Sequence, residues 1–167
     1  MSTTTADNTR PALSSFLGLV FWLGLCFLAA GLGGMATGPE IQGWYATLEK
    51  PPINPPNWVF GPVWTTLFIM MGVAAWRVWR IAGFGGARLA LGLFLAQLVL
   101  NVLWSVLFFA LHSPGAAFVE VFGFWATMLA ATLAFARHDR LAAWLMVPTL
   151  AWVAFAAVLN GWIWWIN

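Results

Sequence analysis

Long apolar segments separated by short polar ones dominate the pattern of the chain. Five stretches between charged residues reach the length of about 20 residues that an α-helix needs to cross a lipid bilayer. They run from Pro11 to Met35, Trp58 to Trp76, Leu89 to Leu111, Gly115 to Ala136 and Leu141 to Trp165. The stretches are continuously apolar and do not alternate with period two, which favours helices over a β-barrel. The predicted fold class is an all-α membrane protein, a bundle of five transmembrane helices.

Composition supports a lipid environment for most of the chain. Of the 167 residues, 62% are hydrophobic and 7% are charged, whereas soluble domains carry about 25% charged residues. A soluble fold of this size could not hide so much apolar surface. We expect one membrane domain over residues 11–167, preceded by a disordered polar tail over residues 1–10. No cluster of basic residues suits nucleic acid, so that class of partner is excluded.

The distribution of basic residues predicts an orientation. With five spans, six arginines fall on the N-terminal side of the membrane and Lys50 alone falls on the other. The six are Arg10, Arg77, Arg80, Arg88, Arg137 and Arg140. By the positive-inside rule, the N-terminus is expected in the cytoplasm and the C-terminus outside. A helical bundle favours the inner membrane of a bacterial cell as its location.

The segment between the first two spans is unusual. It contains the run WYATLEKPPINPPNWVFGPVW, Trp44 to Trp64, which combines three tryptophans, a tyrosine and five prolines. We expect a long structured outer loop from Thr37 to Asn57, stiffened by the prolines. The spacing of Trp44, Tyr45 and Leu48 predicts a short helix within it. The loop is either a lid over a binding site or a cap that only shields the bundle.

Polar residues recur at helical spacing inside two spans. These faces consist of Gln97, Asn101, Trp104 and Phe108 on the third span and of Trp152, Ala156 and Asn160 on the fifth. The amides either join helices by hydrogen bonds or fix a ligand in a mainly aromatic pocket. The chain carries no conventional catalytic motif and no expected metal site. Its two histidines, His112 and His138, lie at predicted helix ends, where solvation is the first interpretation and haem ligation the alternative.

Three of these segments resemble the translocator protein/tryptophan-rich sensory protein family (TspO/MBR), also called the peripheral-type benzodiazepine receptor. The outer loop is similar to the family's W-Y-x-x-L-x-K-P-x-x-x-P-P-x-W-x-F-x-P-V-W. QLVLNVLW matches its third-helix Q-L-x-x-N-x-x-W, and VPTLAWVAFAAVLN is similar to its fifth-helix P-Y-L-x-W-x-x-F-A-x-x-L-N. The resemblance extends from the first span to the end of the chain.

The resemblance implies a five-helix bundle, commonly a homodimer, with a pocket beneath the outer loop. The pocket would bind a tetrapyrrole such as protoporphyrin IX or haem as a ligand, not as an obligatory cofactor. It would also accept isoquinoline carboxamides and benzodiazepine-type ligands. Carried over by motif, the ligand-binding residues would be Trp44, Tyr45, Pro55, Trp64, Gln97, Asn101, Trp104, Trp152 and Ala156.

The resemblance leaves three functions open: a porphyrin receptor or sensor, a porphyrin transporter, and a light-dependent porphyrin-degrading enzyme with Trp44 and Trp152 as candidate electron donors. The absence of an inverted repeat places the transporter second.

Two departures from the family pattern stand out. Thr149 replaces the usual tyrosine of the fifth-helix motif, and NGWIWWIN lacks the tyrosine and base of the animal sterol motif, so sterol binding is not expected.

The third span carries a candidate dimer face. Ala90, Gly92 and Ala96 are small residues that allow close backbone approach, with Gly92 and Ala96 in small-xxx-small spacing. This pattern and the resemblance both predict a homodimer.

Overall fold

The structure is a computed structural model that describes residues 12–167. Its elements are α1 (Ala12–Gln42), α2 (Trp44–Thr47), α3 (Asn57–Gly86), α4 (Arg88–Ser105), the π-helix η1 (Val106–Ala110), α5 (Pro114–Ala136) and α6 (Arg140–Ile166). Within these described residues, five helices are long and apolar enough to cross a membrane, with α4 and η1 forming one of them. The prediction of five helical spans is therefore confirmed. The predicted tail over residues 1–10, and Pro11, lie outside the described residues.

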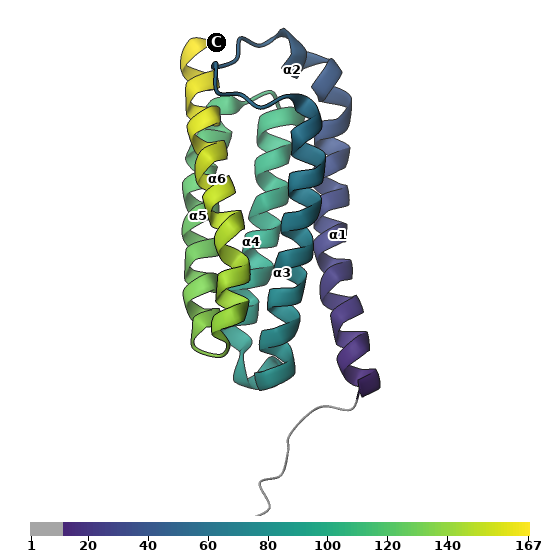
Figure 1. The fold of residues 1–167 in the computed structure, drawn as a ribbon. Helices are drawn as coiled ribbons and strands as arrows, with labels where there is room; N and C mark the ends of the chain where they lie inside the picture. The colour runs from purple at the N-terminus through teal and green to yellow at the C-terminus, as the bar shows by residue number, and fades with distance from the viewer. Residues whose placement is uncertain (1–11) are drawn as a thin grey trace, which may run out of the picture.

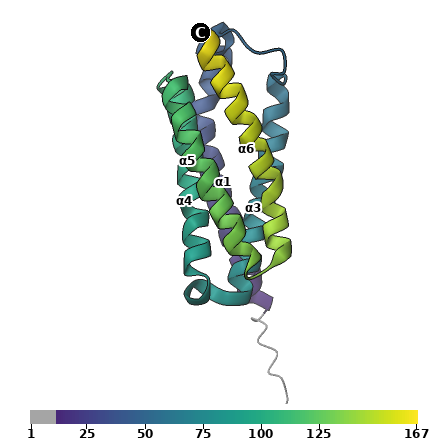
Figure 2. The same cartoon turned by 90° about the vertical axis from the view of Figure 1, so that its left-hand side faces the viewer.

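The five long helices form one bundle, in which neighbours follow the order α1, α3, α6, α5, α4 and back to α1 (Figures 1 and 2). The first described residues and the C-terminus lie at opposite ends (Figure 1). The short connections α3–α4 and α5–α6 lie at the end where α1 begins, which we call the inner end; the opposite end is the outer end. The segment with α2 crosses the outer end (Figure 1).

The outer loop is shorter than the sequence pattern predicts. Helix α1 continues through Thr37 and Pro39 to Gln42, so only residues 43–56 connect it to α3, and α2 occupies part of that connection. A proline near the end of a helix removes one backbone donor but leaves the preceding turns intact. The predicted short helix near Trp44 is confirmed by α2.

Helix α3 also extends beyond the predicted end of its span, to Gly86. The helical geometry breaks at Gly83, whose φ of 67° lies in the left-handed region that glycine adopts without steric cost. One further turn then leads into α4. The connection between α3 and α4 therefore consists of this kink, the turn after it and Ala87.

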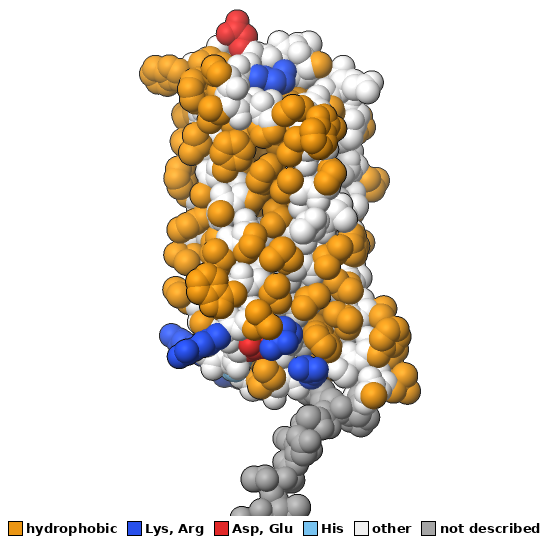
Figure 3. Space-filling view, viewed as in Figure 1, with side chains coloured by type: hydrophobic (Ala, Val, Ile, Leu, Met, Phe, Trp, Pro, Cys, Tyr) orange, Lys and Arg blue, Asp and Glu red, His pale blue; other side chains and the backbone are white. Residues whose placement is uncertain are grey.

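On the face that Figure 3 shows, charged side chains lie at the two ends of the bundle, and hydrophobic side chains cover much of the surface between them. At the inner end, the Nε atom of Arg77 lies 2.6 Å from Oδ2 of Asp139, which joins α3 to the connection between α5 and α6. Oδ1 of Asp139 accepts a hydrogen bond from the Leu141 amide and caps α6. Burial alone would raise the pKa of Asp139, but the hydrogen bond and charge of Arg77, with the backbone amides, lower it overall.

Candidate ligand pocket

A cavity of about 510 Å³ lies in the outer half of the bundle, beneath the connection between α1 and α3. Its wall is built by α1, α3, α4, η1 and α6, together with Tyr45 and Asn54 from the connection. The volume falls within the range of small-molecule sites, about 300–1,000 Å³. Of the described residues, none that lines the cavity is an Asp, Glu, Lys, Arg or His.

Aromatic rings form much of the wall. Trp104 stacks on Phe108 with ring centroids 5.3 Å apart. Trp152 meets Phe60 edge to face at 5.9 Å, which joins α6 to α3 across the cavity. Flat rings held by their neighbours in this way present fixed surfaces on which another aromatic system can stack.

Two asparagines of the wall have different roles. Asn160 is engaged in holding the helices together, because its Oδ1 accepts from the Trp104 indole at 3.0 Å and its Nδ2 donates to the Pro114 carbonyl at 2.7 Å. Asn101 is 6% exposed, and its Nδ2 has no hydrogen-bond partner among the described residues. A buried amide without a partner costs free energy. Asn101 is therefore the side chain of the wall best suited to donate a hydrogen bond to a polar ligand atom.

Tyr45 forms part of the roof of the cavity, as we call the connection over residues 43–56. Its hydroxyl donates to Oδ1 of Asn54 at 3.0 Å, and the Lys50 ammonium lies 4.7 Å from its ring centroid. Burial raises the pKa of the Tyr45 hydroxyl, which keeps it neutral and able to donate. Lys50 also donates to the Leu48 carbonyl at 2.9 Å and does not line the cavity.

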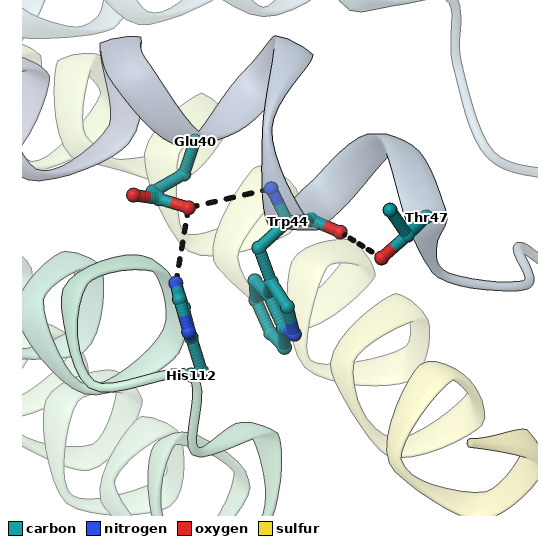
Figure 4. A network of polar contacts seen from close by, with 4 residues as sticks. All are labelled: Glu40, Trp44, Thr47 and His112. Carbon is teal, nitrogen blue, oxygen red and sulfur yellow. Dashed lines mark hydrogen bonds and ion pairs between the residues drawn. The ribbon is translucent and has the colours of Figure 1, made fainter.

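The roof is fastened to the bundle at two places. Oε2 of Glu40, on α1, lies 3.0 Å from Nε2 of His112, in the α4–α5 connection, and accepts the Trp44 amide at 3.4 Å (Figure 4). The imidazole of His112 stacks on the Trp44 indole with centroids 4.4 Å apart. We call Glu40, Trp44 and His112 the outer latch.

The second fastening joins the connection to the end of α6. The side-chain oxygen of Asn167 accepts the Glu49 amide at 2.9 Å, and its Nδ2 donates to the Glu49 carbonyl at 3.1 Å. This pair of bonds resembles one step of a β-ladder, and it fixes the backbone at Glu49. The outer latch therefore holds the roof near Trp44, and the Asn167 side chain holds it at Glu49.

The structure brings six of the nine residues named from the sequence into the wall: Tyr45, Trp64, Asn101, Trp104, Trp152 and Ala156. Three do not line it. Trp44 lies in the outer latch, Pro55 lies in the connection, where its carbonyl accepts from Asn54, and Gln97 lies one helical turn inward of Asn101. Gln97 is fully buried, with its Nε2 3.7 Å from the sulfur of Met71.

Sequence reasoning missed the contribution of α1 and of the π-helical geometry of η1. Helix α1 lines the cavity with Phe27, Ala30, Gly34 and Gly38, among others, and η1 adds Phe109 beside the expected Phe108. The α1 residues recur at spacings of three and four, a signal that was present but indistinguishable from helix packing. The π-helix, with its Leu111 amide bonded to the Val106 carbonyl, carries no comparable sequence signal.

The fold and the cavity together define a multi-pass α-helical membrane protein with a ligand-sized apolar pocket beneath one end. The TspO/MBR family profile matches residues 22–166. The chain is 44% identical over 149 residues to the tryptophan-rich protein TspO of Chlorobaculum tepidum, covering 86% of this chain and 92% of that protein. It is 40% identical over 143 residues to the human translocator protein, covering 82% and 85%. It is 39% identical over 138 residues to the tryptophan-rich sensory protein of Cereibacter sphaeroides, covering 81% and 85%. The chain belongs to the TspO/MBR family and is an integral membrane protein.

Proposed function

We propose that the protein is a receptor or sensor for a tetrapyrrole, which it binds in the cavity beneath the α1–α3 connection. The observation that carries this proposal is the wall itself, in which four tryptophans border a cavity of about 510 Å³ and no described residue is charged. A large, flat, apolar macrocycle suits such a wall, because each stacked ring pair adds about 0.5–1.5 kcal/mol beyond area burial. The Asn101 amide would bind one polar atom of the ligand.

The wall favours a metal-free porphyrin over haem. Haem iron is held by histidine, cysteine, methionine or tyrosine side chains. Among the described residues that line the cavity there is no His, Cys or Met, and the hydroxyl of Tyr45 is engaged with Asn54. His112 belongs to the outer latch and does not line the cavity. Protoporphyrin is therefore the ligand that we propose first.

The same pocket can accept other compact aromatic molecules. Isoquinoline carboxamides and benzodiazepine-type ligands combine fused rings with one or two neutral polar groups. Stacking between Trp104, Trp152 and their neighbours, with one hydrogen bond to Asn101, would satisfy both features. We propose these compounds as competitors of the porphyrin.

If the protein degrades porphyrin in light, Trp152 is the stronger of the two candidate electron donors. Trp152 lies in the wall, whereas Trp44 lies in the outer latch, stacked on His112. Trp152→Phe keeps an aromatic wall, so it should preserve most binding and reduce photodegradation. Trp44→Phe is the matched control. Equal degradation by wild type and Trp152→Phe would exclude this role, and absence of products in wild type would exclude the enzyme activity.

Titration of purified protein with protoporphyrin, followed by quenching of tryptophan fluorescence, tests binding. Ala156→Leu places a larger side chain in the wall, and we expect at least about tenfold weaker binding, or about 1.4 kcal/mol. Lys50→Ala should change affinity little, because the ammonium lies outside the cavity and exposed ion pairs contribute only about 0–1 kcal/mol. The opposite result would mean that the ligand binds superficially by charge.

We further propose that the N-terminus lies in the cytoplasm and the C-terminus outside, in a bacterial inner membrane, because the basic residues gather at the inner end.

A homodimer is proposed through the exposed face of α4 that contains Gly92 and Ala96. A Cβ atom at Gly92 would meet nothing within 4 Å, so this face is open to a second copy. Ala90 is 2% exposed and packs inside its own bundle, which removes it from the predicted interface.

A further inference from the structure

Helices α1 and α3 pack tightly in the inner half of the bundle. A Cβ atom added to Gly72 on α3 would lie 2.7 Å from Cδ2 and 3.2 Å from Cα of Leu23 on α1. A Cβ atom at Gly18 would overlap the ring of Trp79. At these levels the two helices are in direct contact, and no space remains between them.

The same seam is open in the outer half. Counting back from Gly72 at helical spacing, Thr65, Gly61 and Trp58 follow on the same face of α3. A Cβ atom at Gly34, Gly38 or Gly61 would meet no heavy atom within 4 Å, although all three glycines line the cavity.

Residues of this part of the wall are also exposed. Gly34, Gly38, Gly61 and Thr65 are exposed as well as lining the cavity, and Trp58, on the same face of α3, is 74% exposed. With the open space beside the three glycines, this exposure indicates an opening between α1 and α3. We call this opening, bordered by Gly34, Gly38, Gly61 and Thr65, the lateral seam.

We propose that the ligand reaches the cavity from the bilayer through the lateral seam, and not from the aqueous side through the roof. This inference rests on the proposed binding function. A second observation points to a ligand at the end of this path, because Asn101 lines the same cavity and its buried Nδ2 has no hydrogen-bond partner within residues 12–167. The Tyr45–Asn54 bond, the outer latch and the Glu49–Asn167 pair meanwhile hold the roof in place.

The route selects a chemical class of ligand. The part of a molecule that crosses the seam leaves lipid and enters a wall without charged residues, so it must be uncharged. Glycines on both helices leave room for a flat ring system that enters edge-on, since aromatic planes approach to about 3.5–4.0 Å. Ionised groups of a ligand would remain at the outer membrane interface, near Trp58.

A thiol inside the cavity measures access without requiring that the porphyrin binds. Ala156→Cys is introduced together with Cys26→Ala, which removes the buried native thiol. In vesicles of phosphatidylcholine, N-cyclohexylmaleimide serves as the lipid-soluble reagent and a sulfonated methanethiosulfonate as the charged one. The reaction at position 156 is followed by mass spectrometry. We expect the lipid-soluble reagent to react and the charged reagent to react at least about tenfold more slowly.

Two variants of α1 distinguish closure of the lateral seam from the general effect of a bulky side chain on this helix. Gly34→Leu fills the seam and should slow the lipid-soluble reagent by about tenfold. Gly31→Leu is the matched control, because Gly31 is also exposed and has open space around its Cβ position but does not line the cavity. We expect its rate to match that of the parent. Equal rates for Gly34→Leu and Gly31→Leu would overturn the proposal.

Locking the roof tests the competing route. Glu49→Cys with Asn167→Cys replaces the pair that fastens the roof to α6, and oxidation closes it covalently. If the ligand enters through the seam, the locked protein reacts as fast as the reduced one. If the lock stops the reaction, or if the charged reagent reacts as fast as the lipid-soluble one, the route passes through the roof and the proposal is wrong. Failure of the protoporphyrin titration would instead reject the proposed ligand and leave these rates interpretable.

Discussion

The indole nitrogen of Trp104 donates to Oδ1 of Asn160 at 3.0 Å, and this bond connects α4 to α6 directly in the wall of the cavity. Because Asn160 also donates to the carbonyl of Pro114, one amide side chain joins three helices. The polar face predicted on the last span thus combines two roles. Asn160 organises the wall, and Ala156, one turn away, leaves space within it.

Replacing Asn160 should destabilise the bundle. Asn160→Leu removes both bonds and leaves the Pro114 carbonyl without that partner; bonds of this kind contribute about 0.6 kcal/mol on average and at most about 1.7 kcal/mol each in membranes. We expect a loss of about 1–3 kcal/mol, seen as a lower midpoint of thermal unfolding in detergent. Thr66→Ala is the control, since its hydroxyl bonds only within an exposed turn of α3. A midpoint for Asn160→Leu equal to that of the control would contradict the role of this amide.

The seam between α1 and α3 predicts opposite outcomes for two glycines of one helix. Gly72→Ala forces a methyl group against Leu23 and should destabilise the protein by about 1–3 kcal/mol, as overpacking does. Gly61→Ala meets open space and should leave stability unchanged or raise it slightly, because alanine favours the helix by up to about 1 kcal/mol. Thermal unfolding of both variants side by side provides the measurement. Equal destabilisation would mean that the seam is closed along its whole length.

The pair Arg77–Asp139 predicts a dependence of stability on acid. The pKa of Asp139 is lower in the folded protein than the ordinary value of about 3.9, so folding stabilises its charged form. This contribution is fully present above that ordinary value and is lost as the pH falls through the lower folded value. Unfolding midpoints of wild type should therefore decrease from about pH 4 downward more than those of Asp139→Asn.

Two substitutions at position 139 separate the charge from the helix cap. Asp139→Asn keeps a side-chain oxygen for the Leu141 amide, whereas Asp139→Ala removes the cap as well. At neutral pH we expect Asp139→Ala to be less stable than Asp139→Asn by about 0.5–2 kcal/mol, the usual contribution of an N-cap. If the two variants were equally stable, the cap would contribute nothing here.

Tyr45→Phe should loosen the roof without filling the cavity. The substitution removes the hydrogen bond to Asn54 but retains the ring that lines the pocket. A bond of this kind contributes about 0.5–1.5 kcal/mol, so backbone amides of residues 43–56 should exchange hydrogen about two- to tenfold faster. Hydrogen exchange read by mass spectrometry measures this, with helix α5 as the internal reference. Unchanged exchange in the connection would show that the outer latch and the Glu49–Asn167 pair hold it in place without the Tyr45–Asn54 bond.

The sequence by itself determined the five spans and the separation of charge between the two ends. Both follow from a local quantity, the free energy of moving each side chain between water and lipid, which does not depend on the neighbours that it later meets. The short helix at Trp44 was equally predictable, since spacing and proline placement act within a few residues. The same reasoning placed the end of α1 too early, because α1 continues past Met35 and through Pro39 to Gln42.

Only the tertiary structure decided which polar residues face the cavity. Gln97 and Asn101 are equivalent in the sequence pattern, yet the first is fully buried beside Met71 and the second lines the pocket. The difference is one helical turn of depth, and it depends on where α1, α3 and α5 pack against α4.

The outer latch illustrates the same limit, because it joins Glu40 and His112, which are 72 residues apart in the chain. The open part of the seam also arises between two helices, where Gly34 and Gly38 of α1 and Gly61 of α3 border the same cavity. Long-range packing of this kind is set by the shapes of both partners together, and no single segment of the sequence contains it.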